Sequence, residues 1–282
     1  MSSFGTTSPR GFGFWLGVTI LSVVFLAAVA APWLAPYDPA EQFLERRLEP
    51  PSWSHWLGLD ELGRDITSRM LYGARISVGV GLAVVFGAGA VGTLIGTLAG
   101  YFRGRLDAVV MRIADVFLAF PGILLAIALV AVLGPALEHV VLALVVIGWV
   151  GYARLVRGQV LRLREEDYVL AARSAGVATP RVLWRHVLPG VLPVLSVQAS
   201  LGMAGAILAE AGLSFLGLGI QPPTPSWGAM INAGRSHLLD APHLALIPGL
   251  AILLTVLGLN FLGDSLADTL NPRSRRVFKG EG

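Results

Sequence analysis

The sequence predicts an all-α integral membrane protein with six transmembrane helices and with both termini in the cytoplasm. Of its 282 residues, 55% are hydrophobic and only 14% are charged, whereas a soluble domain carries roughly 25% charged residues. Uncharged stretches of about 20 residues, the length of a spanning helix, separate the charged ones. The basic residues also gather on one side of the predicted spans. These features argue against a soluble enzyme fold.

The spans are predicted from the uncharged stretches, at residues 11–37, 76–102, 116–137, 139–153, 187–209 and 241–263. The fourth stretch has only 15 residues, so we expect its helix to continue past Arg154, with arginine side chains reaching toward the membrane surface. A further uncharged stretch, residues 211–234, contains Pro222, Pro223 and Pro225. We interpret it as an external or re-entrant loop, because backbone exposed to lipid must keep its hydrogen bonds internal.

The basic residues predict the orientation. With the N-terminus inside, 15 of them lie in cytoplasmic segments and six lie outside. The small residues at 28–30 leave a cleaved signal peptide as an alternative, but the first apolar run exceeds the usual length of about 7–15 residues and favours an anchor helix. We divide the chain into an anchor helix with an external loop (1–75), a five-helix core (76–272) containing the cytoplasmic loop 154–189, and a basic cytoplasmic tail (273–282).

The sequence lacks the motifs of several enzyme classes. The only lysine, Lys279, is not followed by Ser or Thr, so there is no Walker A loop. The five histidines form no zinc-binding pair at helical spacing, and cysteine and a G-x-S-x-G motif are absent. Residues 87–92 match G-x-G-x-x-G within a span, where we interpret Gly92, Gly96 and Gly100 as a ladder for close helix packing. We predict no enzymatic activity, cofactor, metal site or nucleic-acid partner.

The longest cytoplasmic loop, residues 154–189, has the pattern of two short helices. The acidic run at 165–167 favours the N-terminus of the first helix, and Gly176 favours its end. The Thr-Pro pair at 179–180 is typical of a second helix start, and Pro189 predicts the end of that helix before the fifth span. The small residues of this helix-turn-helix suit close contact with a partner. The alternative is a solvated loop whose charges only set the topology.

This loop resembles the E-A-A-x3-G-x9-I-x-L-P motif of ABC importer permeases. Residues 171–176 read A-A-R-S-A-G, and after nine residues H-V-L-P follows at 186–189. Leu170 stands in place of the motif's Glu, and His186 in place of its Ile. The resemblance implies a coupling helix that docks on an ATPase subunit. The docking residues that it implies are Leu170, Ala171, Ala172, Gly176, His186, Leu188 and Pro189.

Residues 57–77 and 207–228 narrow the resemblance to the C-type permease of dipeptide, oligopeptide and nickel importers. The first begins L-G-L-D-E-L-G-R-D, and the second contains A-E-A-G-L-S-F-L-G-L-G. The resemblance implies a type I ABC importer permease core in the inner membrane, paired with a homologous second permease. It further implies two cytoplasmic ATPase subunits that bind ATP and Mg²⁺, and an external solute-binding protein. We expect a di- or oligopeptide as substrate, with nickel or another small solute as the alternative.

Glu210, Asp115 and Pro121 are candidates for the transport pathway or its gate. An ionisable group between two apolar stretches, as Glu210 is, is a functional candidate, but we favour a conformational role with hydrogen bonds to loop backbone at the outer end of the fifth span. Asp115 is expected to pair with Arg112 on the same helical face. Pro121 interrupts the third span and predicts a kink in a helix that lines a gate.

An ATP-independent secondary transporter is the competing function. It needs charged relays within several spans, and Glu210 is the only candidate for one. A membrane scaffold without conduction, the third possibility, does not need an interrupted pore helix. The sequence therefore favours an importer permease over both alternatives.

Overall fold

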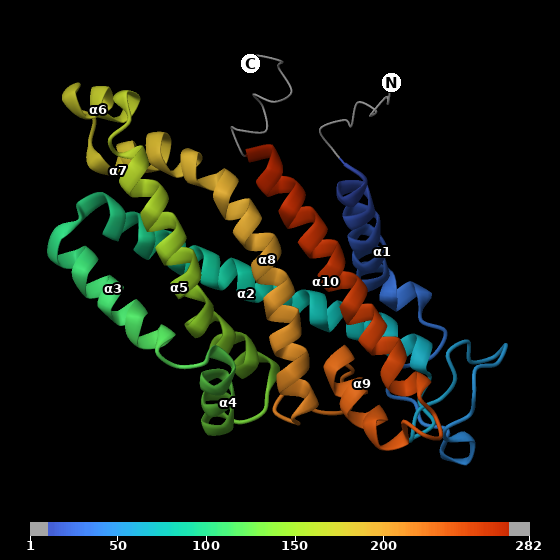
Figure 1. Ribbon diagram of the computed structural model, residues 1–282. Helices are drawn as coiled ribbons and strands as arrows, with labels where there is room; N and C mark the ends of the chain where they lie inside the picture. The colour runs from blue at the N-terminus through green and yellow to red at the C-terminus, as the bar shows by residue number, and fades with distance from the viewer. Residues whose placement is uncertain (1–10, 271–282) are drawn as a thin grey trace, which may run out of the picture.

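The computed structural model describes residues 11–270 as a bundle of α-helices (Figure 1). The long helices are α1 (Phe12–Leu34), α2 (Ile66–Phe102), α5 (Leu137–Leu163), α8 (Leu188–Phe215) and α10 (His243–Leu270). The shorter ones are α3 (Gly104–Leu118), α4 (Gly122–Leu133), α6 (Asp167–Ser174), α7 (Thr179–Val182) and α9 (Trp227–Gly234), with a π-helical turn at Leu183–Val187 and 3₁₀ turns at Leu44–Arg46 and Arg235–His237. These residues form no β-sheet, and one isolated bridge joins Leu59 to Asp65.

The helices cross the membrane region six times if the bent pair of α3 and α4 counts as one crossing. Five helices are long and apolar enough to span, and α3 and α4 meet at 85°. Successive crossings run in opposite directions between the two ends of the bundle (Figure 1). The predicted all-α membrane fold is confirmed. The prediction of the third span was wrong in detail. It gave one kinked helix at 116–137, whereas the structure has two helices there, α3 and α4, and α3 begins already at Gly104.

Local backbone chemistry explains where these two helices begin and end. Arg103 and Gly104 have φ of 58° and 60°, so α2 ends there and the chain turns directly into α3. Pro121 lacks an amide hydrogen and disfavours helical backbone in the residue before it. Accordingly α3 stops at Leu118 and α4 begins after Pro121. The interruption predicted at Pro121 is therefore present, as a sharp bend.

The glycine ladder brings the backbones of α2 and α5 into contact. A Cβ atom on Gly92 would lie 2.5 Å from the carbonyl oxygen of Trp149, and one on Gly100 would lie 2.9 Å from that of Arg157. Gly96, between them, faces the backbone of Ala153. Only residues without a side chain allow this approach, which is how membrane helices pack closely. The predicted helix-packing role of the ladder is confirmed.

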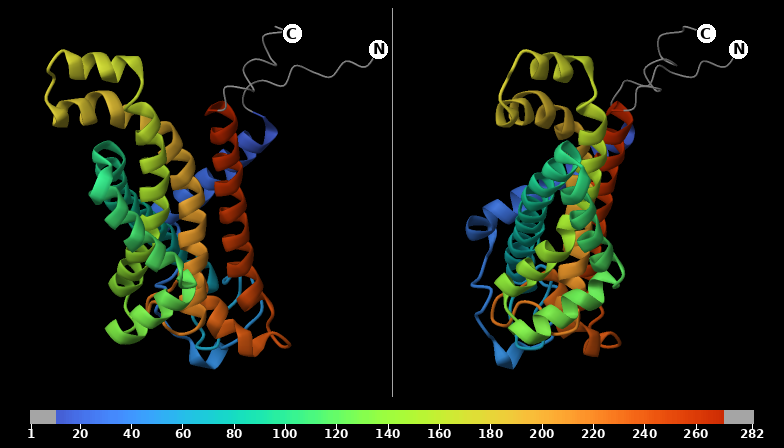
Figure 2. Two further views of the ribbon diagram at one scale, coloured as in Figure 1. Left: turned by 60° about the vertical axis from the view of Figure 1, so that its left-hand side comes forward. Right: turned by 90° about the vertical axis from the view of Figure 1, so that its left-hand side faces the viewer.

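The bundle has two different ends (Figures 1 and 2). The hairpin end carries the α6–α7 hairpin, residues 167–187, which projects beyond the other helices (Figure 2). The opposite end, the loop end, carries the loop 35–65 and α9 (Figure 1). Helix α1 begins and α10 ends at the hairpin end (Figure 1). The basic tail predicted at 273–282 lies outside the described residues.

Four of the long helices extend beyond the uncharged stretches that predicted them: α2, α5, α8 and α10. Helix α5 continues past Arg154 to Leu163, as expected. Helix α2 begins at Ile66 rather than at residue 76, because the Asp65 side chain accepts a hydrogen bond from the amide of Ser68 at 2.7 Å and caps the helix there. Charged residues such as Arg69 therefore lie in its first turns. Span boundaries read from charge alone were too short at these ends.

Candidate coupling surface and transport groove

The helices of the hairpin start and end largely where the sequence predicts, with two exceptions. Helix α6 starts after Glu166 and ends at Ser174. Gly176, in the turn that follows, has a φ of +73°, a conformation that glycine adopts without strain. Ala178, not Thr179, occupies the cap position of α7. The expected end of the second helix at Pro189 was wrong: the amide of Leu188 bonds to the carbonyl of Leu183 across the π-helical turn, and α8 follows without a break. Pro189 has no amide hydrogen to donate back into this continuous helix, and the π-helical turn lies immediately before it.

Buried valines hold the hairpin against the bundle. Val169 of α6, Val182 of α7 and Val187 of the π-helical turn are fully buried. They pack against α5 and α8 in one cluster, through Val156, Val160, Leu163 and Val191. Because the hairpin shares this core with two spanning helices, it moves with them rather than as a free loop.

Two arginines also connect the hairpin to the last turn of α2. The Arg164 guanidinium bonds to the carbonyl oxygen of Tyr101 and lies 5.8 Å from the centre of its ring. Arg173 of α6 lies 6.0 Å from the same ring centre. These contacts are cation–π interactions that orient the hairpin relative to α2. The sequence predicted these arginines as topogenic charges and as charged contacts for a partner, and nothing in it singled out Tyr101.

The hairpin exposes the first half of the family motif and covers part of the second. Leu170, Ala171 and Gly176 are exposed on α6 and its C-terminal turn, and Ala172 is half-buried. The second half comprises His186 and Leu188, which are half-buried at the base, and Pro189, which is exposed. Packing of α6 against α7 and the π-helical turn brings the two halves together. Sequence reasoning missed two exposed aromatic residues of this surface, Tyr168 and Trp184, the latter 77% exposed.

Ion pairs join α3 to α5 near the hairpin end. Arg157 donates to Asp107, with 2.6 Å between Nη2 and Oδ2, and Arg154 donates to Asp115. The expected pairing of Asp115 with Arg112 was wrong, because α3 packs beside α5 and offers a closer guanidinium. The arginines of α5 therefore bind carboxylates of a neighbouring helix, where the sequence suggested that they reach toward the membrane surface.

Two cavities follow one face of α8. The loop-end cavity, about 260 Å³, lies between α2, α4, α5 and α8 and includes Gly122 and Ile123 immediately after Pro121. The hairpin-end cavity, about 650 Å³, lies between α2, α8 and the α7 segment and includes Trp184. Apolar side chains line most of both cavities. We call the two together the transport groove; Pro121 stands at its edge, while Asp115 and Glu210 do not line it.

Glu210 is fully buried at the loop end and bonds to hydroxyl groups. Its carboxylate oxygens accept from Ser77 at 3.2 Å and from Ser214 at 2.8 Å. Ser226, which caps α9 through a bond from Ala229, is a further neighbour of the carboxyl group. The expected bonds to loop backbone were wrong, because serines of α2 and α8 reach the carboxyl first. Glu210 thus connects three elements, which fits a conformational role.

Replacing Glu210 tests that role. Glu210→Leu leaves the buried serine hydroxyls without their acceptor, and we expect a loss of about 1–3 kcal/mol in stability, measured as thermal unfolding of the purified complex. Glu210→Gln keeps an acceptor and is expected to retain most of the stability and of the transport rate. Lost uptake in Glu210→Gln with an unchanged unfolding temperature would instead indicate a charge-dependent role in transport.

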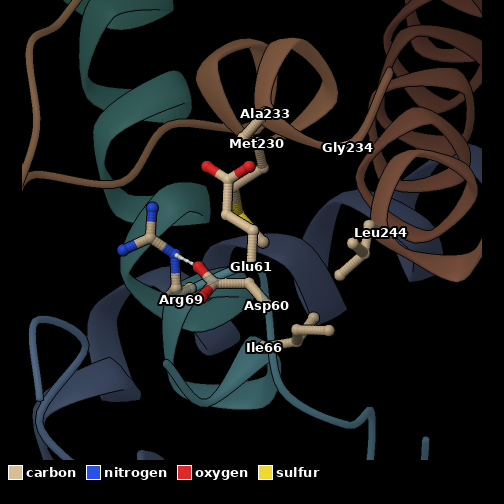
Figure 3. A pocket seen from close by; sticks show the side chains of 8 residues that line it. All are labelled: Asp60, Glu61, Ile66, Arg69, Met230, Ala233, Gly234 and Leu244. Atoms are coloured by element: carbon tan, nitrogen blue, oxygen red, sulfur yellow. Dashed lines mark ion pairs between the residues drawn. The ribbon is translucent and has the colours of Figure 1, made fainter. Parts of the chain in front are cut away.

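A cluster of buried polar side chains lies at the loop end. The Asp60 carboxylate accepts from Arg64 at 2.7 Å and pairs with Arg69 at 3.4 Å (Figure 3). The Asp65 carboxylate contacts the Nδ1 atom of His55 at 3.0 Å. Figure 3 shows Asp60 and Arg69 beside residues of α9 and α10, around a cavity of about 20 Å³. The cluster therefore joins the loop 35–65 to α2, α9 and α10.

The part of the chain that the structure describes contains no grouped set of metal ligands. Within residues 11–270, no three His, Asp or Glu side chains are grouped to hold a metal ion. The loop-end cluster is satisfied instead by pairing between its own acids, arginines and histidine.

Two family models match the chain. The model of binding-protein-dependent transport system inner membrane components matches residues 92–276. The model of the N-terminal TM domain of oligopeptide transport permease C matches residues 13–51. The second match covers most of α1 and part of the loop 35–65, and residues 52–91 lie in neither match.

Curated relatives match most of the chain. It is 49% identical to the glutathione transport system permease protein of Pectobacterium atrosepticum, over 90% of this chain and 85% of the relative. It is 44% identical to the dipeptide transport system permease protein of Alkalihalophilus pseudofirmus, over 92% and 86%. The fold is similar to a solved chain of the MetNI methionine ABC transporter in inward-facing conformations, with a TM-score of 0.55 and 18% identity over 72% of this chain and 96% of that one.

The first family match includes both the glycine ladder and the hairpin. The solved chain of similar fold belongs to an ABC transporter. The chain therefore belongs to the binding-protein-dependent transport system inner membrane components: it is a multi-pass inner-membrane permease of an ABC importer, of the oligopeptide permease C type.

Proposed function

We propose that this chain forms half of the translocation pathway of an importer for di- or oligopeptides. The observation that carries the proposal is the continuity of the hairpin with α8: α7 leads through the π-helical turn into the helix that lines the transport groove. Movement of the hairpin is thus transmitted to the groove. The names of the relatives, which specify glutathione and dipeptide, support a short peptide as substrate.

The proposed assembly contains a homologous second permease, two cytoplasmic ATPase subunits and an external solute-binding protein. The transport groove is open along one side, which suits completion by a second permease. The hairpin end faces the cytoplasm in this proposal, and with it the start of α1 and the end of α10. Five arginines between residues 154 and 173 lie at that end, in keeping with the positive-inside rule. ATP and Mg²⁺ bind to the ATPase subunits and not to this chain.

Coupling follows from contacts between the hairpin and the ATPase. ATP binding closes the ATPase dimer and draws the two hairpins together, through the surface formed by Leu170, Ala171 and Gly176. The shared valine core passes this motion to α5 and α8, and the Asp115–Arg154 pair passes it to α3 and the bend at Pro121. The groove then opens outward, and hydrolysis reverses the change. Such coupling requires that the ATPase bind the two permease states with different affinity.

Gly176→Val tests the coupling role. A β-branched residue at φ +73° is strained by about 1–3 kcal/mol, although no atom lies close enough to clash. We expect insertion and assembly to be retained, and peptide uptake and substrate-stimulated ATPase activity to fall about tenfold, which corresponds to about 1.4 kcal/mol. Gly158→Val is the matched control, because Gly158 is an exposed helical glycine of α5 with open space around it. Unchanged stimulation in Gly176→Val would remove the coupling role.

The composition of the assembly and its substrate are tested by purification and reconstitution. The tagged chain, extracted from its native membrane in mild detergent, is expected to bring with it a second permease, two ATPase copies and the binding protein. In proteoliposomes this complex should drive ATP-dependent accumulation of labelled dipeptide, which unlabelled peptide but not Ni²⁺ suppresses. Uptake by the chain alone, without ATPases, would contradict the proposal and revive a secondary transporter.

A further inference from the structure

The two cavities lie end to end along one face of α8. The α8 residues in the hairpin-end cavity include Leu188, Leu192 and Leu195, and those in the loop-end cavity include Gly202, Gly205 and Ala206. These positions follow one another at helical spacing, so they form one stripe. The stripe runs almost the full length of the helix. A solute that follows it passes from one end of the bundle to the other.

Two residues border both cavities, Val85 on α2 and Tyr152 on α5, and the aromatic ring of Tyr152 is the larger side chain. Its ring extends from α5 toward glycines of two neighbouring helices. A Cβ atom on Gly202 of α8 would lie 2.5 Å from the Tyr152 hydroxyl oxygen, and one on Gly89 of α2 would lie 3.6 Å from the ring. The side chain is only 5% exposed. Tyr152 thus fills the space between α2 and α8 at the point where the cavities meet.

We propose that Tyr152 is the gate of the transport groove, the side chain that separates its loop-end half from its hairpin-end half. The inference rests on the proposed function, in that the groove must be the pathway of the substrate. Beyond the proposed function, it names Tyr152 as the residue that closes the pathway and its hydrogen bond to Gln198 as the contact that holds it closed. Substrate passes only when the ring leaves the space between Gly202 and Gly89.

The contacts of Tyr152 suit a side chain that moves. Its hydroxyl donates to the backbone carbonyl of Gln198 at 3.4 Å, a long and therefore weak hydrogen bond. Glycines lie on two sides of the ring, and the cavities on either side offer space of about 260 and 650 Å³. A displacement of α8 relative to α5 during the proposed cycle separates the hydroxyl from that carbonyl and frees the ring.

Site-directed labelling of the complete reconstituted complex tests the gate. This chain contains no cysteine, so a single introduced cysteine adds one labelling site, and the unaltered complex measured in parallel gives the background from the partner subunits. Thr93→Cys lines the hairpin-end cavity and Gly205→Cys lines the loop-end cavity, where no atom crowds a new side chain. In the nucleotide-free complex, a membrane-impermeant thiol reagent on the hairpin side is expected to label Thr93→Cys and to label Gly205→Cys at least about tenfold more slowly.

Removing the ring should abolish that difference. Adding Tyr152→Ala is expected to raise the labelling rate of Gly205→Cys from the hairpin side about tenfold, and to make loaded proteoliposomes leak peptide without ATP. Tyr152→Phe keeps the ring but loses the hydroxyl that holds it, so the labelling rate of Gly205→Cys should lie between the rates measured with Tyr152 and with Tyr152→Ala. Gly202→Ala is a second test, in which the Tyr152 side chain is kept. The added methyl group displaces the Tyr152 hydroxyl and should also raise the labelling rate of Gly205→Cys.

The outcomes separate the gate from the proposed function. Labelling of Gly205→Cys from the hairpin side as fast as Thr93→Cys, with Tyr152 in place, would overturn the gate while ATP-driven uptake continues. Unchanged labelling and leak in both Tyr152→Ala and Gly202→Ala, with the complexes assembled, would overturn it as well. Absence of ATP-driven peptide uptake by the unaltered complex would instead reject the proposed function.

Discussion

Gly96→Val is expected to prevent the chain from reaching its folded state. A Cβ atom at this position would meet the Ala153 carbonyl oxygen, and it would lie 3.0 Å from both the Cα atom of Ala153 and the Cβ atom of Val156. Backbone atoms of a spanning helix cannot rotate away, so α2 and α5 must separate. Forced overpacking of this kind costs about 3 kcal/mol or more. Little of the variant should elute as a single species from size-exclusion chromatography in detergent.

Gly79→Val is the matched control for this experiment. Gly79 lies on the same helix, but nothing is within 4 Å of the position where its Cβ atom would be. This variant should be produced and purified like the unaltered chain. If Gly96→Val folds as well as Gly79→Val, the contact between α2 and α5 does not depend on the glycine ladder.

Asp65→Ala is expected to unfold the loop end of the protein. The Asp65 carboxylate accepts from the amide and the hydroxyl of Ser68 at 2.7 and 2.8 Å, and it contacts His55, which is 2% exposed. Its removal therefore uncaps α2 and leaves a buried imidazole without its partner. Removing one member of a buried pair costs about 3–5 kcal/mol. A protease added on the loop side should cut the loop 35–65 much faster, and the unfolding temperature should fall.

Two further variants serve as controls for this prediction. Asp65→Asn retains an acceptor for the helix cap and should lose less stability than Asp65→Ala. Glu41→Ala removes an exposed carboxylate from the same loop and should change the cleavage rate little. Equal cleavage of the Asp65→Ala and Glu41→Ala variants would contradict a structural role for the cluster.

The features that the sequence predicted well are those set by local chemistry. A span requires a stretch without charge, a helix start requires a capping group and a helix end favours glycine in the left-handed region. These requirements identify five of the crossings, α6 with its end at Gly176, and the interruption at Pro121. The glycine ladder is also local, since it needs only small residues at intervals of four on one helix.

Features that depend on a second helix were predicted poorly. The partner of Asp115 is Arg154, 39 residues away, and not the neighbouring Arg112. Glu210 bonds to Ser77, 133 residues away. Both outcomes follow from which helices pack together, and a pattern along one helix does not contain that information. The same holds for the continuity through Pro189, because the segment on either side of it packs against α5 in the shared valine cluster.

The sequence by itself predicted a six-span permease with a coupling motif in a cytoplasmic loop, because spans, caps and family motifs are all properties of neighbouring residues. Only the tertiary structure decided where the transport groove lies, which side chains border both of its halves and which groups satisfy the buried charges. Those depend on the distances between helices that are far apart in the chain. The position of Tyr152 between Gly89 and Gly202 exists only once α2, α5 and α8 are packed together.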